Sequence, residues 1–476
     1  MAILEKKVVS FAFFVLMMSS FWGSNFLRDV QAATQVTVTV DSTKIVGVNF
    51  FSAGFQLDGP DINNWMSKSS LRQLASGAAF KMVRFFDYRV QPCIRWYESS
   101  KTGRWNWAQV DTLITQILQM GAKPLIVLGF YNWNRDRLET PSGMAVNPTT
   151  GLPYTASWVA YAKEWVKHFK ERGLNVEYYE LVNEPYHYFE WDNTKKLNYY
   201  IDLFSEAAQA MRTVNPHIKI SNDASIMKNV LNALISRKIK IDFLSYHGYG
   251  VGSLSASDSE IIASAETKYI GESRSIYGVD KAKQVYKEAT GIDLPVIKSE
   301  NNINFAYSSG TDPRIQQMVG VIYNALTIKT FILKGFMCNI YFHFASSASA
   351  EDDRPSGGYG FGMVNLDNNK PWYPYYLYKL IGTNLDVGDT IISATSSSED
   401  IRVVAWVHGA RKNLMIILKS NVQKSVYING LKGQLTYFKI SNAISWKTPA
   451  VQTGILQTSS PISMNGYTVI LLQTSL

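Results

Sequence analysis

Eight short apolar runs, most of them separated by amphipathic helical patterns, constrain the fold of this 476-residue chain more than any other feature. The runs are continuously apolar, as in strands buried on both faces of a parallel sheet. The segments at 110–120, 157–172 and 195–214 repeat apolar residues at helical spacing and end at Gly or Asn-Pro. The eight runs are KIVGVNFF (44–51), FKMVRFF (80–86), KPLIVLGF (123–130), VEYYELVNE (176–184), HIKISND (217–223), IDFLSYH (241–247), LPVIKSE (294–300) and GFMCNIYFHF (335–344).

This alternation of strand and helix predicts an α/β fold, a (β/α)₈ TIM barrel with insertions, over residues 44–384. A doubly wound open sheet is the alternative. No G-x-G-x-x-G follows the first run, which counts against that alternative.

The sequence pattern changes after about residue 385, where helical periodicity ends. Short alternating strands separated by Gly, Asn and Ser predict an antiparallel β-sandwich over 385–476. The segment 33–43 contains TQVTVTVD, which alternates cleanly, and we expect this N-terminal strand to join the sandwich.

Residues 1–32 have the pattern of a signal peptide. Lys6 and Lys7 precede an apolar stretch at 8–22, which is short for a membrane span, and small residues allow cleavage after Ala32. An uncleaved anchor is the alternative. We expect a secreted or cell-surface protein with no membrane contact beyond such an anchor.

Charge and cysteine content exclude several classes of protein. The net charge of +9 is spread along the chain, so no nucleic-acid partner is expected. Cys93 and Cys338 cannot form a disulfide framework, and free thiols are favoured over one bridge. The six histidines lack metal-ligand spacing, so we expect no metal and no cofactor. The oligomeric state is left open.

Polar residues stand at the ends of the predicted barrel strands. Arg84 closes the second, Asn183 and Glu184 close the fourth, and Glu300 closes the seventh. Because the carboxyl ends of barrel strands form the functional face, the two glutamates are expected to face each other. Two facing carboxyl groups, one protonated and one ionised, are what glycosidic bond cleavage requires. Arg84 near Glu300 would hold that group as a carboxylate.

Four segments resemble the catalytic strands of clan A glycoside hydrolases. YYELVNEP (178–185) is similar to the acid/base strand, PVIKSEN (295–301) to the nucleophile strand, DFLSYHGY (242–249) to strand six and MVRFF (82–86) to strand two. The approach to Glu184 over 157–185, with the appended sandwich, looks most like the β-xylosidase-like family 39. Family 5, 30 and 79 types remain alternatives.

The resemblance implies a retaining β-glycosidase that works by double displacement. Glu184 would be the acid/base, with a pKa above that of a free Glu, and Glu300 the nucleophile. Asn183 would bind the sugar 2-hydroxyl, Tyr249 would donate to Glu300, and His247 would orient nearby groups. Glu180, deeper on the same strand, is expected to be a structural carboxylate paired with Arg or Lys.

Aromatic residues near the strand ends complete the predicted site. Trp133 and Trp191 follow the third and fourth strands and are expected to stack on sugar rings. The resemblance implies a Trp at the end of strand eight, where this chain has Tyr341 or His343, and Tyr341 is expected to contact the substrate. The substrate is an oligosaccharide or polysaccharide whose sugar the sequence does not fix. The alternatives are a family 5-like endo-β-glucanase or mannanase, and a non-catalytic carbohydrate-binding surface protein. Retention of both glutamates argues against the last.

Overall fold

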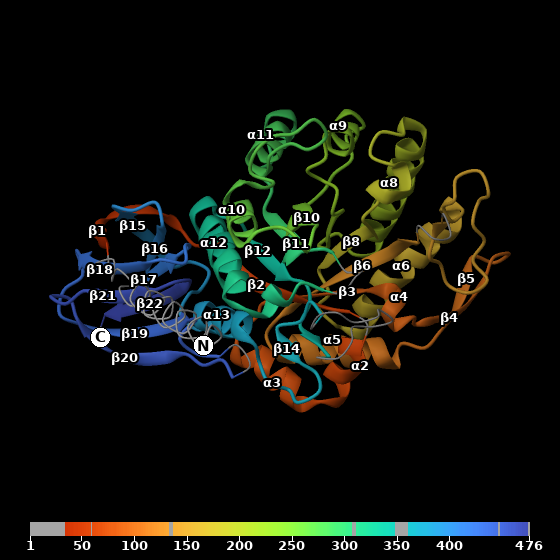
Figure 1. Cartoon of the computed structure of the whole chain (residues 1–476). Helices are drawn as coiled ribbons and strands as arrows, with labels where there is room; N and C mark the ends of the chain where they lie inside the picture. The colour runs from red at the N-terminus through yellow and green to blue at the C-terminus, as the bar shows by residue number, and fades with distance from the viewer. Residues whose placement is uncertain are drawn as a thin grey trace, which may run out of the picture.

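The computed structural model describes residues 34–58, 60–132, 137–306, 311–347, 360–445 and 448–474. The expected signal segment 1–32 and Trp133 lie outside the described residues. Among the described helices, none is long and apolar enough to cross a membrane. The described chain forms a barrel and a separate β-sheet unit that pack against each other (Figure 1).

Eight parallel strands form the barrel, which confirms the predicted fold class. They are hydrogen-bonded in the order β10-β11-β12-β2-β3-β6-β8-β9, and β7 (Arg137–Leu138) adds to the rim end of β6. From first to eighth in the chain, they are β2 (Ser52–Leu57), β3 (Met82–Phe86), β6 (Lys123–Asn132), β8 (Tyr178–Asn183), β9 (Lys219–Ser221), β10 (Leu244–Val251), β11 (Val296–Asn304) and β12 (Cys338–Tyr341).

Helices follow the barrel strands and cover the outside of the sheet (Figure 1). In α6, apolar side chains at helical spacing are buried against the barrel, and Gly173 ends the helix with a left-handed φ of 67°. The principal helices are α2 (Pro60–Ser67), α3 (Ser69–Gly77), α5 (Ala108–Gln119), α6 (Thr155–Arg172), α8 (Thr194–Val214), α9 (Lys228–Ser236), α10 (Asp258–Thr267), α11 (Val279–Thr290), α12 (Met318–Lys334) and α13 (Tyr373–Gly382).

The first barrel strand differs from the prediction. The run at 44–51 mostly continues β1 (Thr34–Val48), which pairs antiparallel with β15 (Thr390–Ser396) as far as Val48. The barrel strand is β2 instead, so the barrel begins at residue 52 and not at 44. An apolar run looks the same in sequence whether or not it is buried, and here Ile45 is 66% exposed.

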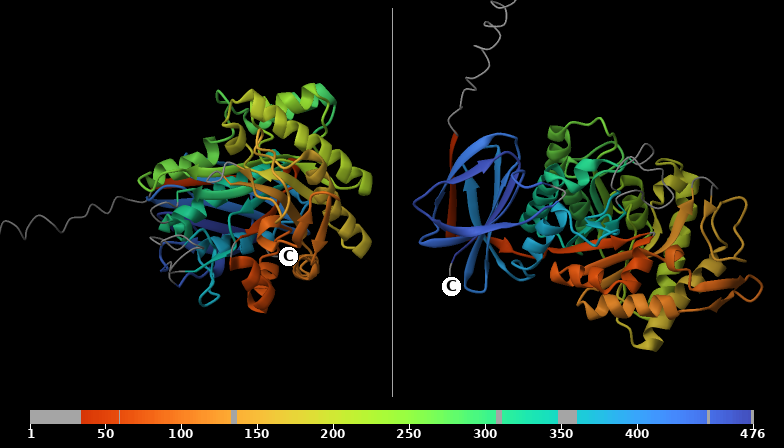
Figure 2. Two further views of the ribbon diagram at one scale, coloured as in Figure 1. Left: turned by 90° about the vertical axis from the view of Figure 1, so that its right-hand side faces the viewer. Right: turned by 60° about the horizontal axis from the view of Figure 1, so that its bottom comes forward.

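The C-terminal unit is one curled sheet of nine strands, in the order β20-β19-β22-β17-β16-β15-β1-β18-β21. β1 comes from the other end of the chain and joins this sheet (Figure 2). It pairs with β15 on one side and with β18 on the other. Its pairing with β18 is parallel, and the other pairings are antiparallel. The remaining strands are β16 (Ile401–His408), β17 (Arg411–Leu418), β18 (Gln423–Asn429), β19 (Gln434–Ser441), β20 (Gln452–Gln457), β21 (Ile462–Asn465) and β22 (Thr468–Thr474).

This sheet is fixed to the barrel by packing and by polar contacts. The buried Trp406 indole donates to the carbonyl of Asn384 at 2.6 Å. Glu266, at the end of α10, pairs with Arg402 at 2.8 Å and with Lys419 at 3.4 Å. One cluster of buried apolar side chains also spans both units and includes Trp406, Met415 and Leu471 of the sheet.

The barrel interior is layered. Six apolar side chains fill its floor, near the strand starts: Met82, Leu125, Phe243, Ile297, Cys338 and Ile340. Two residues further along three of these strands stand Arg84, Ser245 and Ser299, all fully buried. Because side chains alternate along a strand, positions two apart point into the same interior. Both cysteines are buried free thiols.

Candidate active site

The end of β8 carries Glu184 on an unusual backbone. Val182 and Glu184 both have left-handed φ values, 67° and 47°. The backbone N–H of Glu184 donates to Asp223 Oδ2 at 2.8 Å, which holds the turn. Such conformations cost about 1–3 kcal/mol each in non-glycine residues and concentrate at functional sites. The turn sets the Glu184 carboxyl group at the mouth, the end of the barrel where its strands finish.

Glu300 reaches the same place through a β-bulge in β11. Tyr246 of β10 pairs with Lys298, but His247 pairs with Glu300, so Ser299 is an extra residue. Ser299 Oγ lies 2.8 Å from Ser245 Oγ inside the barrel, and the next side chain, Glu300, also points inward. The bulge gives two consecutive residues of β11 the same direction.

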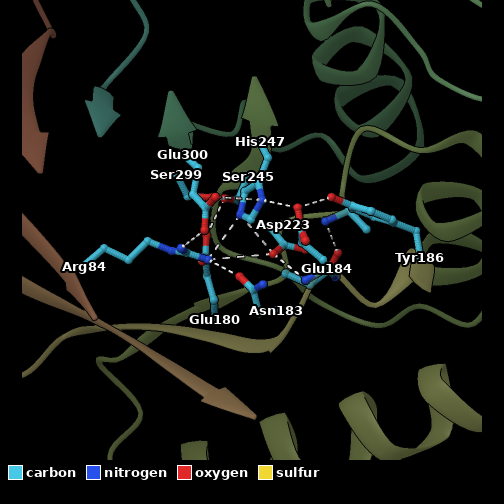
Figure 3. Close-up of polar contacts among 12 residues, drawn as sticks. Arg84, Glu180, Asn183, Glu184, Tyr186, Asp223, Ser245, His247, Ser299 and Glu300 are labelled. Carbon is cyan, nitrogen blue, oxygen red and sulfur yellow. Dashed lines mark hydrogen bonds and ion pairs between the residues drawn. The ribbon is translucent and has the colours of Figure 1, made fainter. Parts of the chain in front are cut away.

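Arg84 is the centre of the buried polar network (Figure 3). Its Nε donates to Glu180 at 2.8 Å, Nη1 to Glu300 at 2.6 Å and Nη2 to Asn183 Oδ1 at 2.8 Å. Asp223 lies 3.8 Å from Nη2. Glu180 is therefore a structural carboxylate paired with arginine, as predicted. A buried guanidinium stays charged because these carboxylates compensate for its lost hydration.

His247 lies between three carboxyl groups. Its Nδ1 is 2.9 Å from Glu184 Oε1 and 3.5 Å from Glu300 Oε2, and its Nε2 is 3.1 Å from Asp223 Oδ2. Burial alone lowers the pKa of His247, but the charges of Glu300 and Asp223 outweigh it, so this pKa is well above its usual value. The ring connects the two candidate catalytic groups.

Glu300 accepts two further hydrogen bonds besides its contact with His247. Arg84 holds Oε1, and the hydroxyl of Tyr249 donates to Oε2 at 2.6 Å. Burial outweighs the stabilisation of the ionised form by His247, Arg84 and Tyr249, so the pKa of Glu300 is above its usual value. The predicted contacts of Arg84 and Tyr249 with this carboxyl group are present.

Glu184 has a different set of partners. The Tyr186 hydroxyl donates to Oε1, and His187 Nε2 lies 3.4 Å from Oε2. Burial acts to raise the pKa of Glu184, but hydrogen bonds from His187 and His247 lower it below the usual value. The predicted upward shift is therefore not observed. That prediction considered desolvation and did not include two histidines at hydrogen-bonding distance.

The separation of the two carboxyl groups is short. A carboxylate oxygen of Glu184, a ring nitrogen of His247 and a carboxylate oxygen of Glu300 all lie within 4.8 Å of one another. Retaining glycosidases place their carboxyl groups about 5–5.5 Å apart, whereas inverting enzymes leave roughly 6.5–9.5 Å for a water molecule. Within the described chain, these three side chains are also the one group close enough to hold a metal ion.

A cavity of about 690 Å³ opens above these groups. Trp191 lines it and is 44% exposed. Tyr341 does not line it: the side chain is fully buried and its ring packs on Tyr378 of α13, 5.6 Å between centroids. Ile340 faces the barrel floor, so Tyr341 faces the helices and Phe342 returns to the cavity.

Several site residues were given no role from the sequence. Asp223 ends the β9 region and contacts both His247 and the Glu184 backbone. Tyr186 and His187 directly follow the Asn-Glu-Pro motif, and their closeness to Glu184 in the sequence could have identified them as site residues. Asp58 and Arg89 line the cavity and pair at 2.6 Å, from two different rim segments.

A (β/α)₈ barrel with two glutamates facing each other, one directly after its fourth strand and one within its seventh, defines a retaining glycoside hydrolase of clan A. Residues 36–429 match the sequence family described as glycosyl hydrolases family 39. The chain belongs to this family, which confirms the resemblance and decides against the family 5-like alternative. No curated protein sequence matches the chain significantly.

Solved structures with the same fold include two of this family. A GH39 β-xylosidase from Caulobacter crescentus superposes with a TM-score of 0.65 at 15% identity, over 92% of this chain and all of that one. The GH39 enzyme from Xanthomonas axonopodis pv. citri gives 0.67 at 15% identity, over 94% and 99%. A GH51 α-L-arabinofuranosidase from Thermotoga petrophila RKU-1 gives 0.63 at 12%, over 93% and 100%.

Proposed function

We propose that the chain hydrolyses β-xylosides, with Glu300 as nucleophile and Glu184 as acid/base. The observation that carries the assignment is the short approach of these carboxyl groups at one barrel mouth. Their environments support different roles. Arg84 and Tyr249 hydrogen-bond the two oxygens of Glu300 and favour its ionised form, whereas Glu184 is bordered by the exposed His187 and faces the cavity.

In the first step, Glu300 attacks the anomeric carbon while Glu184 transfers a proton to the leaving oxygen. Because His247 contacts both Glu184 and Glu300, the protonation of each of these three side chains depends on that of the other two. The pKa of Glu184 alone therefore does not decide whether it can deliver a proton. The glycosyl ester that forms removes the charge of Glu300. Without that neighbouring charge the pKa of Glu184 falls further, which suits its second role as base toward water.

Asn183 supports the sugar in this scheme. Its side-chain oxygen accepts from Arg84, which leaves the amide nitrogen to donate to the sugar 2-hydroxyl in the cavity. This contact strengthens as charge develops at the anomeric centre. Arg84 thus positions both the nucleophile Glu300 and Asn183, which binds the sugar beside it.

Two observations support xylose as the sugar. The chain belongs to family 39. Two structures from Caulobacter crescentus that share its fold are described as β-xylosidases. The decisive test is a panel of aryl β-glycosides of xylose, glucose, galactose, mannose and arabinose, with soluble polysaccharides alongside.

We expect the xyloside to be cleaved fastest and NMR to show the β-anomer first. A 2-fluoroxyloside with a good leaving group should label Glu300, identified by peptide mass spectrometry. Preference for another sugar contradicts the substrate, an initial α-anomer contradicts the retaining mechanism, and label on another residue contradicts the nucleophile.

We also propose that the protein is exported. The support is the basic Lys6 and Lys7 followed by the apolar stretch at 8–22. Expression of the full chain and of a chain starting at residue 33, followed by cell fractionation, tests this. N-terminal sequencing of the exported form is expected to begin at Ala33, and retention of both forms inside the cell contradicts the proposal.

A further inference from the structure

The part of the cavity beyond Glu184 is lined by apolar side chains. Figure 3 shows Tyr186 on the far side of Glu184 from Arg84 and Glu300. Because the acid/base protonates the leaving oxygen, side chains on this far side contact the leaving group, or aglycone. We call these cavity-lining residues the aglycone wall: Tyr186, Trp191, Ile226, Met227, Tyr269 and Ile276.

The aglycone wall is built from three segments that hold one another in place. Tyr186 stacks on Trp191, with centroids 4.7 Å apart and planes at 26°. Asn229, at the start of α9, donates from Nδ2 to the Trp191 carbonyl at 2.7 Å. A backbone bridge joins Met227 to Ile276. The wall is therefore ordered before any ligand binds, which reduces the entropic cost of binding.

The aglycone wall offers few hydrogen-bond partners to a second sugar ring. Ile226, Met227 and Ile276 have no side-chain hydrogen-bond donors, and the Tyr186 hydroxyl is engaged with Glu184, so the Trp191 indole and the Tyr269 hydroxyl are the remaining donors of the wall. Sugar hydroxyls pressed against such a surface lose their water without gaining partners. The rim segments after β2 and β3 differ, because there the Asp58–Arg89 pair offers charged partners for hydroxyls.

We propose that the aglycone wall binds an apolar aglycone, an aryl or alkyl group, in preference to a second sugar. The proposal rests on the proposed function, because it needs Glu184 as the acid. A cavity of about 690 Å³ holds such a group together with the sugar. The exposed face of Trp191 is the platform on which a planar or extended apolar group lies.

The test uses methyl, butyl and octyl β-xylosides and xylobiose. The alkyl alcohols are leaving groups of similar acidity, so differences in kcat/KM report apolar contact. We expect kcat/KM to rise by up to about fourfold per methylene over the first few carbons, through KM, and xylobiose to fall below butyl xyloside. A flat alkyl series, or xylobiose as the best substrate, overturns the proposal.

Variants locate the effect on the aglycone wall. Trp191→Ala and, separately, Met227→Gln should lower the octyl-to-methyl ratio of kcat/KM by about tenfold. Trp191→Phe should restore most of it. The matched control is Tyr97→Ala, because Tyr97 is a 43% exposed aromatic on β4 (Cys93–Tyr97) away from the cavity. An unchanged ratio in both folded wall variants overturns the proposal.

Different results contradict the β-xylosidase activity and the apolar aglycone. If the wild-type protein cleaves no β-xyloside, the proposed function is wrong. If it cleaves methyl xyloside and Glu300 takes the fluorosugar label, but the alkyl series is flat, the proposed function stands and the apolar aglycone is wrong.

Discussion

The floor and the mouth of the barrel are built from the same strands and have opposite chemistry. On β3, Met82 belongs to the floor and Arg84 to the polar network, and on β11 Ile297 and Ser299 differ in the same way. Both layers are almost fully buried. The floor gains stability by removing apolar surface from water, whereas the polar network holds charges that burial disfavours.

This difference separates the residues that hold the barrel together from those that perform the reaction. A change in the floor should act on the free energy of unfolding and leave the chemistry intact. A change at the mouth should lower the rate of the reaction and have a smaller effect on the free energy of unfolding. Each prediction below tests that separation.

The largest effect is expected for Glu300→Ala. Loss of the nucleophile should lower kcat by at least about 10⁴-fold, with the protein still folded. Azide should enter the space left by the carboxylate and form an α-glycosyl azide, detectable by NMR. Formation of the β-azide instead assigns the acid/base role to this residue.

Glu184→Gln should act according to the leaving group. On alkyl xylosides, which need protonation, we expect a loss of about 10²–10⁴-fold in kcat/KM. On a dinitrophenyl xyloside, whose leaving group is acidic, the first step should be nearly unchanged. Stopped-flow measurement of the dinitrophenolate burst reads that step directly, and an equal loss on all leaving groups contradicts the acid assignment.

Ile297→Ala tests the floor. Removing this fully buried side chain should cost about 2–5 kcal/mol of unfolding free energy, measured by denaturant titration. Its kcat at a temperature where it is folded should match wild type. A large drop in kcat of the folded variant shows that the floor positions the catalytic groups, and the separation proposed above then fails.

Tyr249→Phe tests the electrostatics of the mouth. The Tyr249 hydroxyl donates to Glu300 and favours its ionised form, so its removal should raise the pKa of Glu300. Because the nucleophile must be ionised, the acidic limb of the kcat/KM profile should move to higher pH by up to about one unit. Movement to lower pH contradicts this reading of the hydrogen bond.

The smallest effect is expected from metal removal. Glu184, His247 and Glu300 are close enough to ligate an ion, but their proposed roles require free carboxyl groups. Treatment with a chelator should leave activity unchanged, and added Zn²⁺ should inhibit reversibly. Loss of activity on chelation, restored by one metal, would show that the mouth works with a bound ion.

Much of the barrel was predictable because its strands and helices carry strong local patterns. The predicted helices at 110–120, 157–172 and 195–214 correspond to α5, α6 and α8. The first barrel strand was not predictable in the same way. The run at 44–51 has the composition of a buried strand, yet it mostly continues β1 along β15, and only this pairing reveals that.

The candidate site shows the same limit. Asn183, Glu184 and Glu300 were identified because motifs place them at strand ends, and Glu180 was correctly predicted to pair with a basic residue. The position of His247 between three carboxyl groups was not predicted, and neither was the low pKa of Glu184, which hydrogen bonds from His187 and His247 lower. A pKa depends on partners that are distant in sequence.

By itself, the sequence determined the periodicity of the strands and helices, the two glutamates carried by the fourth and seventh strand segments, and hence the class of reaction. The tertiary structure decided where each side chain points. One extra residue in β11 turns Glu300 inward, and alternation along β12 sends Tyr341 outward and Phe342 into the cavity. The physical reason is that local patterns record burial, whereas direction and charge environment depend on strand register and on neighbours brought together by folding.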